Sequence, residues 1–198
     1  MMKLLNQRPL VVALAGPNGA GKTTFYRAYL RASGLRFVNA DVMARELGVD
    51  PYQAARLADS IRRQLIEQRE SFIFETVFSD PLGDKLTFLR EAENSGYTVA
   101  LFFIGIEGPD LSDQRVTMRV LKGGHDVPSD KIIARYPRVM HNLKRALAEL
   151  SNVLVYDNSG LKTPYRLVAV KESGQNIEFY EPAPEWLRML LPQKVNNP

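Results

Sequence analysis

Gly16-Pro17-Asn18-Gly19-Ala20-Gly21-Lys22-Thr23 is the stretch that decides how the other residues are interpreted. It follows the pattern G-x-x-x-x-G-K-T, which is typical of loops that bind nucleotide phosphates. Glycines let the backbone turn tightly and direct successive N–H groups at phosphate oxygens. Lys22 is expected to reach the β- and γ-phosphates, and the Thr23 hydroxyl to bind Mg²⁺. The stretch therefore predicts a site for a nucleoside triphosphate.

The residues on either side of the loop support this interpretation. Residues 10–15 form an apolar run of strand character immediately before it. Residues 24–32 contain neither glycine nor proline and can open a helix, whose N-terminus favours anions. A strand, a glycine-rich loop and a helix in this order are the context that the motif requires.

Hydrophobic periodicity along the rest of the chain switches repeatedly between strand-like and helix-like. Asp50, proline and then Gln53 form a typical helix start. Further strands are expected at residues 35–40, 72–78, 97–106 and 152–156. Further helices are expected at residues 50–69, 81–96, 109–122 and 129–150, with Ser129 as the cap of the last helix and an interruption at Pro137.

This alternation predicts an α/β fold of the P-loop NTPase type, a three-layer structure in which helices flank a five-stranded, largely parallel sheet. Ligands of such sheets bind beyond the carboxyl ends of the strands. A β-hairpin is expected at 165–171 and 175–180, in a C-terminal appendage of about 160–198 whose apolar segment, 186–191, docks on the body. The length of 198 residues predicts a single domain.

Composition narrows the class of protein. A net charge of +4 is too small to demand nucleic acid as a partner. The chain has no cysteine, which excludes disulfides and thiolate metal sites. No apolar run is long enough to span a membrane. We therefore expect a cytoplasmic protein that binds neither nucleic acid nor a membrane.

Two carboxylates occur where such a sheet would place an active site: one follows a strand, and the other lies within the next strand. Asp41 follows the second strand, and it could cap the next helix or accept a proton from a substrate hydroxyl. Glu75 lies in an apolar strand, where an ionised carboxylate is costly unless it is paired or functional. One of the two could be the base while the other holds the substrate or a metal-bound water.

Arginines gather between the fourth and fifth strands, where P-loop kinases insert a lid, here about residues 107–138. Arg115 and Arg119 are spaced i, i+4 on one helix face, and Arg135 and Arg138 follow. They could form a solvated basic face or close over a triphosphate and neutralise charge on the transferred group. His125 is expected to order a loop rather than to act as a base, and His141 is expected to lie on the surface or to pack.

Together these motifs resemble the zeta-toxin family of P-loop kinases, including small bacterial proteins labelled predicted ABC-type ATPases. The resemblance covers roughly residues 10–158. Besides the loop, it rests on Val38-Asn39-Ala40-Asp41, on Phe74-Glu75-Thr76 and on Arg115-Val116-x-x-Arg119-Val120-x-x-Gly123-Gly124-His125-x-Val127-Pro128.

The resemblance implies transfer of a phosphoryl group from ATP, with Mg²⁺, to a sugar hydroxyl, as on UDP-N-acetylglucosamine. It implies that Asp41 is the general base and that Glu75, with Thr76, holds the substrate. It also implies a possible antitoxin partner. The expected catalytic residues are Asp41, Lys22, Arg119 and Arg135, and the expected nucleotide-binding residues are Gly16, Pro17, Asn18, Gly19, Ala20, Gly21, Lys22, Thr23, Thr24, Arg115 and Asn158, the last near adenine.

Two other functions compete with this one. A non-kinase ATP-binding switch, or an accessory ATPase that acts through a protein partner, would hydrolyse ATP slowly and would not need Asp41. An enzyme that phosphorylates nucleic-acid ends would need a basic groove with exposed aromatics, which the small net charge does not favour. The pair of acids, and the lack of an aspartate at the end of an apolar run, favour the kinase.

Overall fold

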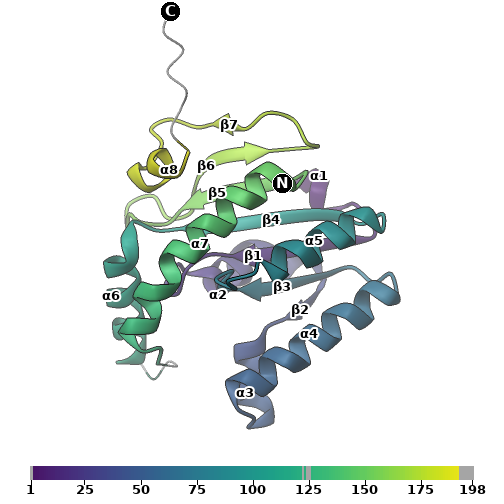
Figure 1. The fold of residues 1–198 in the computed structure, drawn as a ribbon, viewed down its shortest axis with the longest axis horizontal. Helices are drawn as coiled ribbons and strands as arrows, with labels where there is room; N and C mark the ends of the chain where they lie inside the picture. The colour runs from purple at the N-terminus through teal and green to yellow at the C-terminus, as the bar shows by residue number, and fades with distance from the viewer. Residues whose placement is uncertain (1, 122, 124–125, 192–198) are drawn as a thin grey trace, which may run out of the picture.

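The fold is built on a seven-stranded sheet with the strand order β2-β3-β1-β4-β5-β6-β7 (Figure 1). The computed structural model describes residues 2–121, 123 and 126–191. The first five strands in this order are parallel, and β6 and β7 add to them in antiparallel pairing. The strands are β1 (Leu10–Ala15), β2 (Arg36–Val38), β3 (Phe72–Thr76), β4 (Thr98–Gly105), β5 (Val153–Asp157), β6 (Arg166–Lys171) and β7 (Glu178–Phe179).

Helices cover both faces of the sheet, which gives the three layers expected from the sequence (Figure 1). The central strand β1 is buried along its whole length. Its alternate residues enter two separate apolar clusters, Val11 and Ala13 in one and Leu10 and Val12 in the other, because successive side chains of a strand point to opposite faces. Apolar burial on both faces is what continuous apolar strands predict.

The helical segments differ in length and regularity. The described helices are α1 (Met2–Leu5), α2 (Lys22–Phe25), α3 (Ala40–Leu47), α4 (Pro51–Glu67), α5 (Asp84–Asn94), α6 (Gly108–Val120), α7 (Ser129–Glu149) and α8 (Glu185–Leu190). After α2 the chain continues as a π-helical turn and a short 3₁₀ turn to Ser33. Asp50 caps α4 by accepting bonds from the backbone N–H groups of Tyr52 and Gln53, as the sequence predicts.

The expected interruption at Pro137 is wrong, because α7 runs through it without a break. Proline removes one backbone donor, whose acceptor would be the carbonyl of Ile133. Both residues lie on the exposed face of α7, where water can bond that carbonyl. Apolar residues on the other face, among them Val139 and Leu143, are fully buried and hold the helix against the sheet. The expected cap at Ser129 is also wrong, since Pro128 occupies that position and no side chain caps the helix.

The C-terminal hairpin extends the sheet, so the sheet has seven strands and not five. β6 pairs with β5 along Val153 to Asp157, which makes the hairpin continuous with the core. The docking of the tail is confirmed for the described residues, since Trp186 and Leu187 of α8 are buried. The indole Nε1 of Trp186 donates to Asp157 Oδ1 at 3.0 Å. Among the described residues, no helix combines the length and the apolar character needed to cross a bilayer.

Candidate active site

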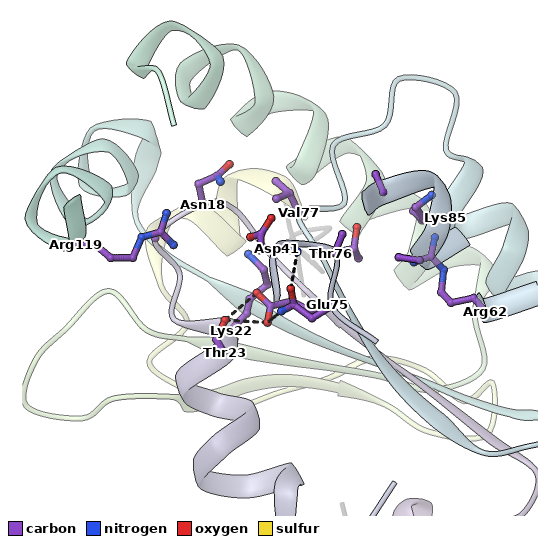
Figure 2. A pocket seen from close by; sticks show the side chains of 15 residues that line it. Asn18, Lys22, Thr23, Asp41, Arg62, Glu75, Thr76, Val77, Lys85 and Arg119 are labelled. Carbon is purple, nitrogen blue, oxygen red and sulfur yellow. Dashed lines mark hydrogen bonds between the residues drawn. The ribbon is translucent and has the colours of Figure 1, made fainter. Parts of the chain in front are cut away.

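A cavity of about 210 Å³ opens beyond the carboxyl ends of β1, β2 and β3 (Figure 2). Its position is the one expected for a parallel α/β sheet. Most of the polar residues that the sequence singles out around the loop, the second strand and the third strand meet here. The cavity is lined by Asn18, Gly19, Lys22, Thr23, Asn39, Ala40, Asp41, Ala55, Ala58, Arg62, Glu75, Thr76, Val77, Lys85 and Arg119.

The glycine-rich loop has a backbone that only glycine adopts easily. Gly16 has a φ of 145°, and a Cβ there would lie 2.2 Å from the carbonyl oxygen of Ile104. Gly21 has a φ of 90°, and a Cβ there would lie 2.7 Å from the hydroxyl of Tyr165. Both positions therefore need glycine for conformation and for space. The loop is a packed structure that keeps its shape between the sheet and the β5–β6 connection.

Lys22 lies at the mouth of this loop with its ammonium group held by the loop itself. Its Nζ donates to the carbonyl oxygens of Gly16 at 2.9 Å and Pro17 at 3.0 Å, and the residue is 7% exposed. Burial lowers the pKa of Lys22, while the negative charges of Glu75 and Asp41 oppose the shift. A buried ammonium with two carboxylates nearby can meet the charge of a phosphate group.

Thr23 and Asn39 both donate to the carboxylate of Glu75. The Thr23 hydroxyl donates to Oε2 of Glu75 at 2.9 Å and to Oε1 at 3.1 Å, and Asn39 Nδ2 donates to Oε2 at 2.9 Å. Strand register explains the meeting: Val38 of β2 lies beside Phe74 of β3, so the next residues on each strand are neighbours. Burial raises the pKa of Glu75, with Lys22 and the Thr23 hydroxyl opposing the rise.

Asp41 does not cap the helix that follows it. Asn39 is the cap of α3, and its Oδ1 accepts from the backbone N–H groups of Asp41 and Val42 at 2.9 and 3.1 Å. Within the described residues, the Asp41 carboxylate is tied to no other group by a hydrogen bond. Its side chain lines the cavity and also a neighbouring space of about 580 Å³, which it shares with Thr23, Asn39 and Arg119.

The predicted lid arginines take three different positions. Arg119 extends from α6 toward the centre of the cavity in Figure 2 and lines it. Arg115 donates from its guanidinium to the carbonyl oxygen of Ser159 at 3.0 Å. Arg135 lies on α7 and is not among the residues that line the cavity, so its catalytic role stays a prediction. Gly124 and His125, which carry part of the resemblance, lie outside the described residues.

Three residues from later parts of the chain donate hydrogen bonds to backbone carbonyl oxygens of the glycine-rich loop. The Ser112 hydroxyl donates to the Asn18 carbonyl at 2.5 Å, the Tyr165 hydroxyl donates to the Gly21 carbonyl at 3.0 Å, and Asn158 Nδ2 donates to the Ala20 carbonyl at 2.9 Å. Sequence reasoning placed Asn158 near adenine and did not single out Ser112 or Tyr165. Nothing local marks the last two, because their partners are far away in the sequence.

Thr76 and the oxygen atoms of Thr23 and Glu75 are further polar groups of the cavity. Thr76 lines the cavity while its hydroxyl oxygen accepts from the backbone N–H of Phe78 at 3.0 Å. Among the described residues there is no cluster of three or more histidine, cysteine, aspartate or glutamate side chains that could hold a metal alone. The Thr23 hydroxyl and the Glu75 carboxylate fit Mg²⁺, which prefers oxygen ligands and is usually bound jointly with substrate phosphates.

Comparison with known sequences gives a family match and a distant relative. A family model described as "Zeta toxin" matches residues 49–167, a range that contains Glu75 and Arg119 but neither the glycine-rich loop nor Asp41. An uncharacterized protein of Haemophilus influenzae is 25% identical over 139 residues, which are 68% of this chain and 97% of that protein.

Comparison with solved structures shows the same fold in proteins of low sequence identity. The complex of AvrRxo1-ORF1 with ORF2 and ATP contains a chain that matches with a TM-score of 0.73 at 18% identity, over 99% of this chain and 68% of that one. A chain of the PezAT toxin–antitoxin system of Streptococcus pneumoniae matches with a TM-score of 0.58 at 20% identity, over 83% of this chain and 72% of that one. A putative kinase of Chloroflexus aurantiacus matches with a TM-score of 0.54 at 18% identity, over 79% of this chain and 92% of that one.

Proposed function

Because this chain belongs to the zeta toxin family, we propose that it is an ATP- and Mg²⁺-dependent phosphotransferase. It moves the γ-phosphate of ATP to a hydroxyl group of a small molecule, and Asp41 acts as the general base. The acceptor that we propose is a UDP-amino sugar such as UDP-N-acetylglucosamine, which follows from the family resemblance and from the room beside Asp41.

One observation carries the proposal: Asp41 shares a cavity with Lys22, Thr23 and Arg119. A base must come within hydrogen-bond reach of the proton that it removes, and the phosphoryl group must lie next to the same hydroxyl. The position of Asp41 in the same cavity as the phosphate-binding lysine supports this role. Its hydrogen-bonding capacity is not taken up by helix capping, because Asn39 performs that role.

The proposed step is an in-line displacement at the γ-phosphorus. The Asp41 carboxylate accepts the proton of the acceptor hydroxyl, the hydroxyl oxygen forms a bond to phosphorus, and the bond between phosphorus and the oxygen of ADP breaks. Lys22 and Arg119 offset the negative charge on the phosphate oxygens. Thr23, oriented by Glu75, would hold Mg²⁺, which when bound neutralises phosphate charge.

A protein partner that covers the cavity is a further part of the proposal. The solved structures that this fold resembles include a chain bound to a second protein, AvrRxo1-ORF1 with ORF2, and a component of a toxin–antitoxin system. An antitoxin that binds this chain over the loop would block ATP. Co-purification of the chain with the product of a neighbouring gene, followed by loss of ATP binding in the complex, would test this.

The direct test is transfer of label from γ-³²P-ATP. The purified chain is incubated with Mg²⁺ and a panel of UDP-sugars, free sugars, nucleosides and oligonucleotides, and the products are separated. We expect label on one class of small hydroxyl compound, and none with the variant Lys22→Ala. Label that appears only as inorganic phosphate, at a rate that no acceptor changes, would favour the ATPase or switch and overturn the kinase.

A further inference from the structure

The cavity has a second charged end that the proposed phosphoryl transfer does not use. Arg62 from α4 and Lys85 from α5 line it together, on the side away from the glycine-rich loop. In Figure 2 these two side chains stand at one end, Lys22 and Arg119 lie toward the other, and Asp41 lies between. The cavity therefore connects a phosphate-binding end to a separate cationic end.

Arg62 is buried in a way that is unusual for arginine. The residue is 4% exposed, and its guanidinium lies over the ring of Phe74, 4.9 Å from the centroid. One terminal nitrogen is paired with Asp59. The Nε is buried and has no hydrogen-bond partner among the described residues. A buried N–H without an acceptor is costly, so the position of Arg62 needs an explanation.

The two cations at this end share one oxygen of a carboxylate. Lys85 Nζ donates to Oδ1 of Asp59 at 3.2 Å, and Arg62 pairs with the same oxygen atom. A second acid is close by, since Asp80 Oδ2 accepts from the backbone N–H of Lys85 at 3.2 Å. Both cations keep N–H donors beyond their contact with Asp59, because an ammonium carries three and a guanidinium five.

We propose that Arg62 and Lys85 form a subsite for an oxyanion group of the acceptor, either a phosphate or a carboxylate. This inference rests on the proposed function and deepens it: these two side chains bind the anionic group of the acceptor, which in a UDP-amino sugar is the diphosphate. Its hydroxyl reaches Asp41 while its anionic group binds Arg62 and Lys85. Ala55 and Ala58 on α4 line the same cavity, and their small side chains leave room for the body of the acceptor.

The subsite is tested first without any transfer reaction. The chain is loaded with Mg²⁺ and the non-hydrolysable analogue AMP-PNP, so that the glycine-rich loop is filled. Its melting temperature is then measured against sodium phosphate, with sodium acetate and sodium chloride at equal ionic strength in parallel. A ligand that binds only the folded chain raises the melting temperature. We expect phosphate or acetate to do so beyond chloride, and the anion that acts identifies the source of the oxyanion.

Variants locate the binding. Lys85→Gln removes a half-buried charge that the fold tolerates better than loss of Arg62, and Arg62→Gln removes the buried one. Each should weaken the anion effect about tenfold or more in concentration, because hydrogen bonds to charged groups are strong. Arg63→Gln, at an exposed arginine on the same helix, is the matched control and should leave it unchanged. An equal response of wild type and Lys85→Gln would overturn the subsite.

Kinetics then connect the subsite to the acceptor. Among compounds of the labelling panel, a pair that differs only in an anionic group, such as N-acetylglucosamine and its 1-phosphate, is compared. We expect the anionic member to have the higher kcat/KM, and Lys85→Gln to raise its KM about tenfold while the KM for ATP stays the same. Equal use of the neutral member would overturn the subsite but leave the kinase intact. Absence of any transfer would overturn the kinase, and the melting experiment would still decide the subsite.

Discussion

The two ends of the cavity hold their charged groups with different kinds of partner. At the loop end, Lys22 bonds to two carbonyl oxygens, and Glu75 accepts bonds from Thr23 and Asn39. At the other end, Arg62 and Lys85 share one oxygen of Asp59, and the buried Nε of Arg62 has no partner among the described residues. Asp41 lies between the two ends, and its carboxylate accepts no hydrogen bond from a described residue.

The difference suggests separate tasks for the two ends. Groups that are already paired keep their geometry, which suits a phosphate site that must be the same in every turnover. Arg62 and Lys85 keep N–H donors beyond those paired with Asp59, which suits selective binding of a ligand with matching acceptors. Substitutions at either end therefore have different expected consequences.

Lys22→Ala breaks the loop end. We expect kcat/KM for ATP to fall about 10⁴-fold, because the ammonium contributes to both nucleotide binding and charge stabilisation. Steady-state kinetics and calorimetric ATP titration measure the two parts. Lys144→Ala, at an exposed lysine on the outer side of α7, is the control and should behave as wild type. Retention of ATP affinity and turnover in Lys22→Ala would remove the loop from the mechanism.

Glu75→Gln, also at the loop end of the cavity, is expected to reduce phosphoryl transfer without lowering the stability of the fold. Burial raises the pKa of Glu75 in the folded state. At pH values between the normal carboxyl pKa and this raised pKa, Glu75 is protonated in the folded chain and ionised in the unfolded chain. Stability contributed by this group therefore falls as pH rises through that window. We expect Glu75→Gln to be at least as stable as wild type at pH 7.5, with a shallower loss of stability from pH 5 to 8, while Mg²⁺-dependent transfer falls about 100-fold.

The stability of Glu75→Gln is measured by thermal unfolding at a series of pH values. Its activity is measured by transfer assays at several Mg²⁺ concentrations. A variant that is less stable than wild type at neutral pH, with normal transfer, would show that Glu75 is a structural carboxylate only.

Arg119→Gln tests the lid side of the cavity. We expect kcat to fall about tenfold, less than for a buried donor, because Arg119 is largely exposed and its charge is screened. The loss should grow as salt is lowered, since wild type gains more from the charge under those conditions. Rates at several salt concentrations measure it, with Arg63→Gln as the matched control. Identical salt dependence of Arg119→Gln and wild type would exclude a role for this charge.

Tyr165→Phe has the smallest expected effect. It removes the hydroxyl that donates to the Gly21 carbonyl but keeps the ring against Phe25. We expect a loss of about 1 kcal/mol in unfolding free energy and a few-fold weaker ATP binding. Chemical denaturation and ATP titration measure both. Tyr52→Phe, at a tyrosine that is 72% exposed, is the control. Unchanged stability and affinity would show that the hydroxyl does not support the loop.

Local sequence signals predict those parts of the fold that local physics decides. The loop, the apolar strand before it and the Asp50 cap could be found because each depends on a few neighbouring residues. The capping of α3 by Asn39 instead of Asp41 could not be chosen beforehand, since both residue types make good caps and the end of β2 decides between them. That choice leaves the Asp41 side chain to the cavity.

Contacts between residues far apart in the chain could not be predicted from the sequence. Tyr165 and Gly21 are 144 residues apart, and no periodic pattern connects them. The pairing of β6 with β5, which extends the sheet, depends on an edge that exists only after the core has formed. Arg62 looks like an ordinary polar residue of an amphipathic helix, and only its burial against Phe74 shows that it belongs to the cavity.

The central claim is that Asp41 activates the acceptor in a cavity where the loop holds ATP. The variant Asp41→Asn tests it most directly when the rate of label transfer and the affinity for ATP are measured on the same preparation. We expect kcat to fall about 10³-fold while the Kd for ATP stays within about threefold of wild type. Transfer at the wild-type rate, or a loss that weaker ATP binding fully explains, would contradict it.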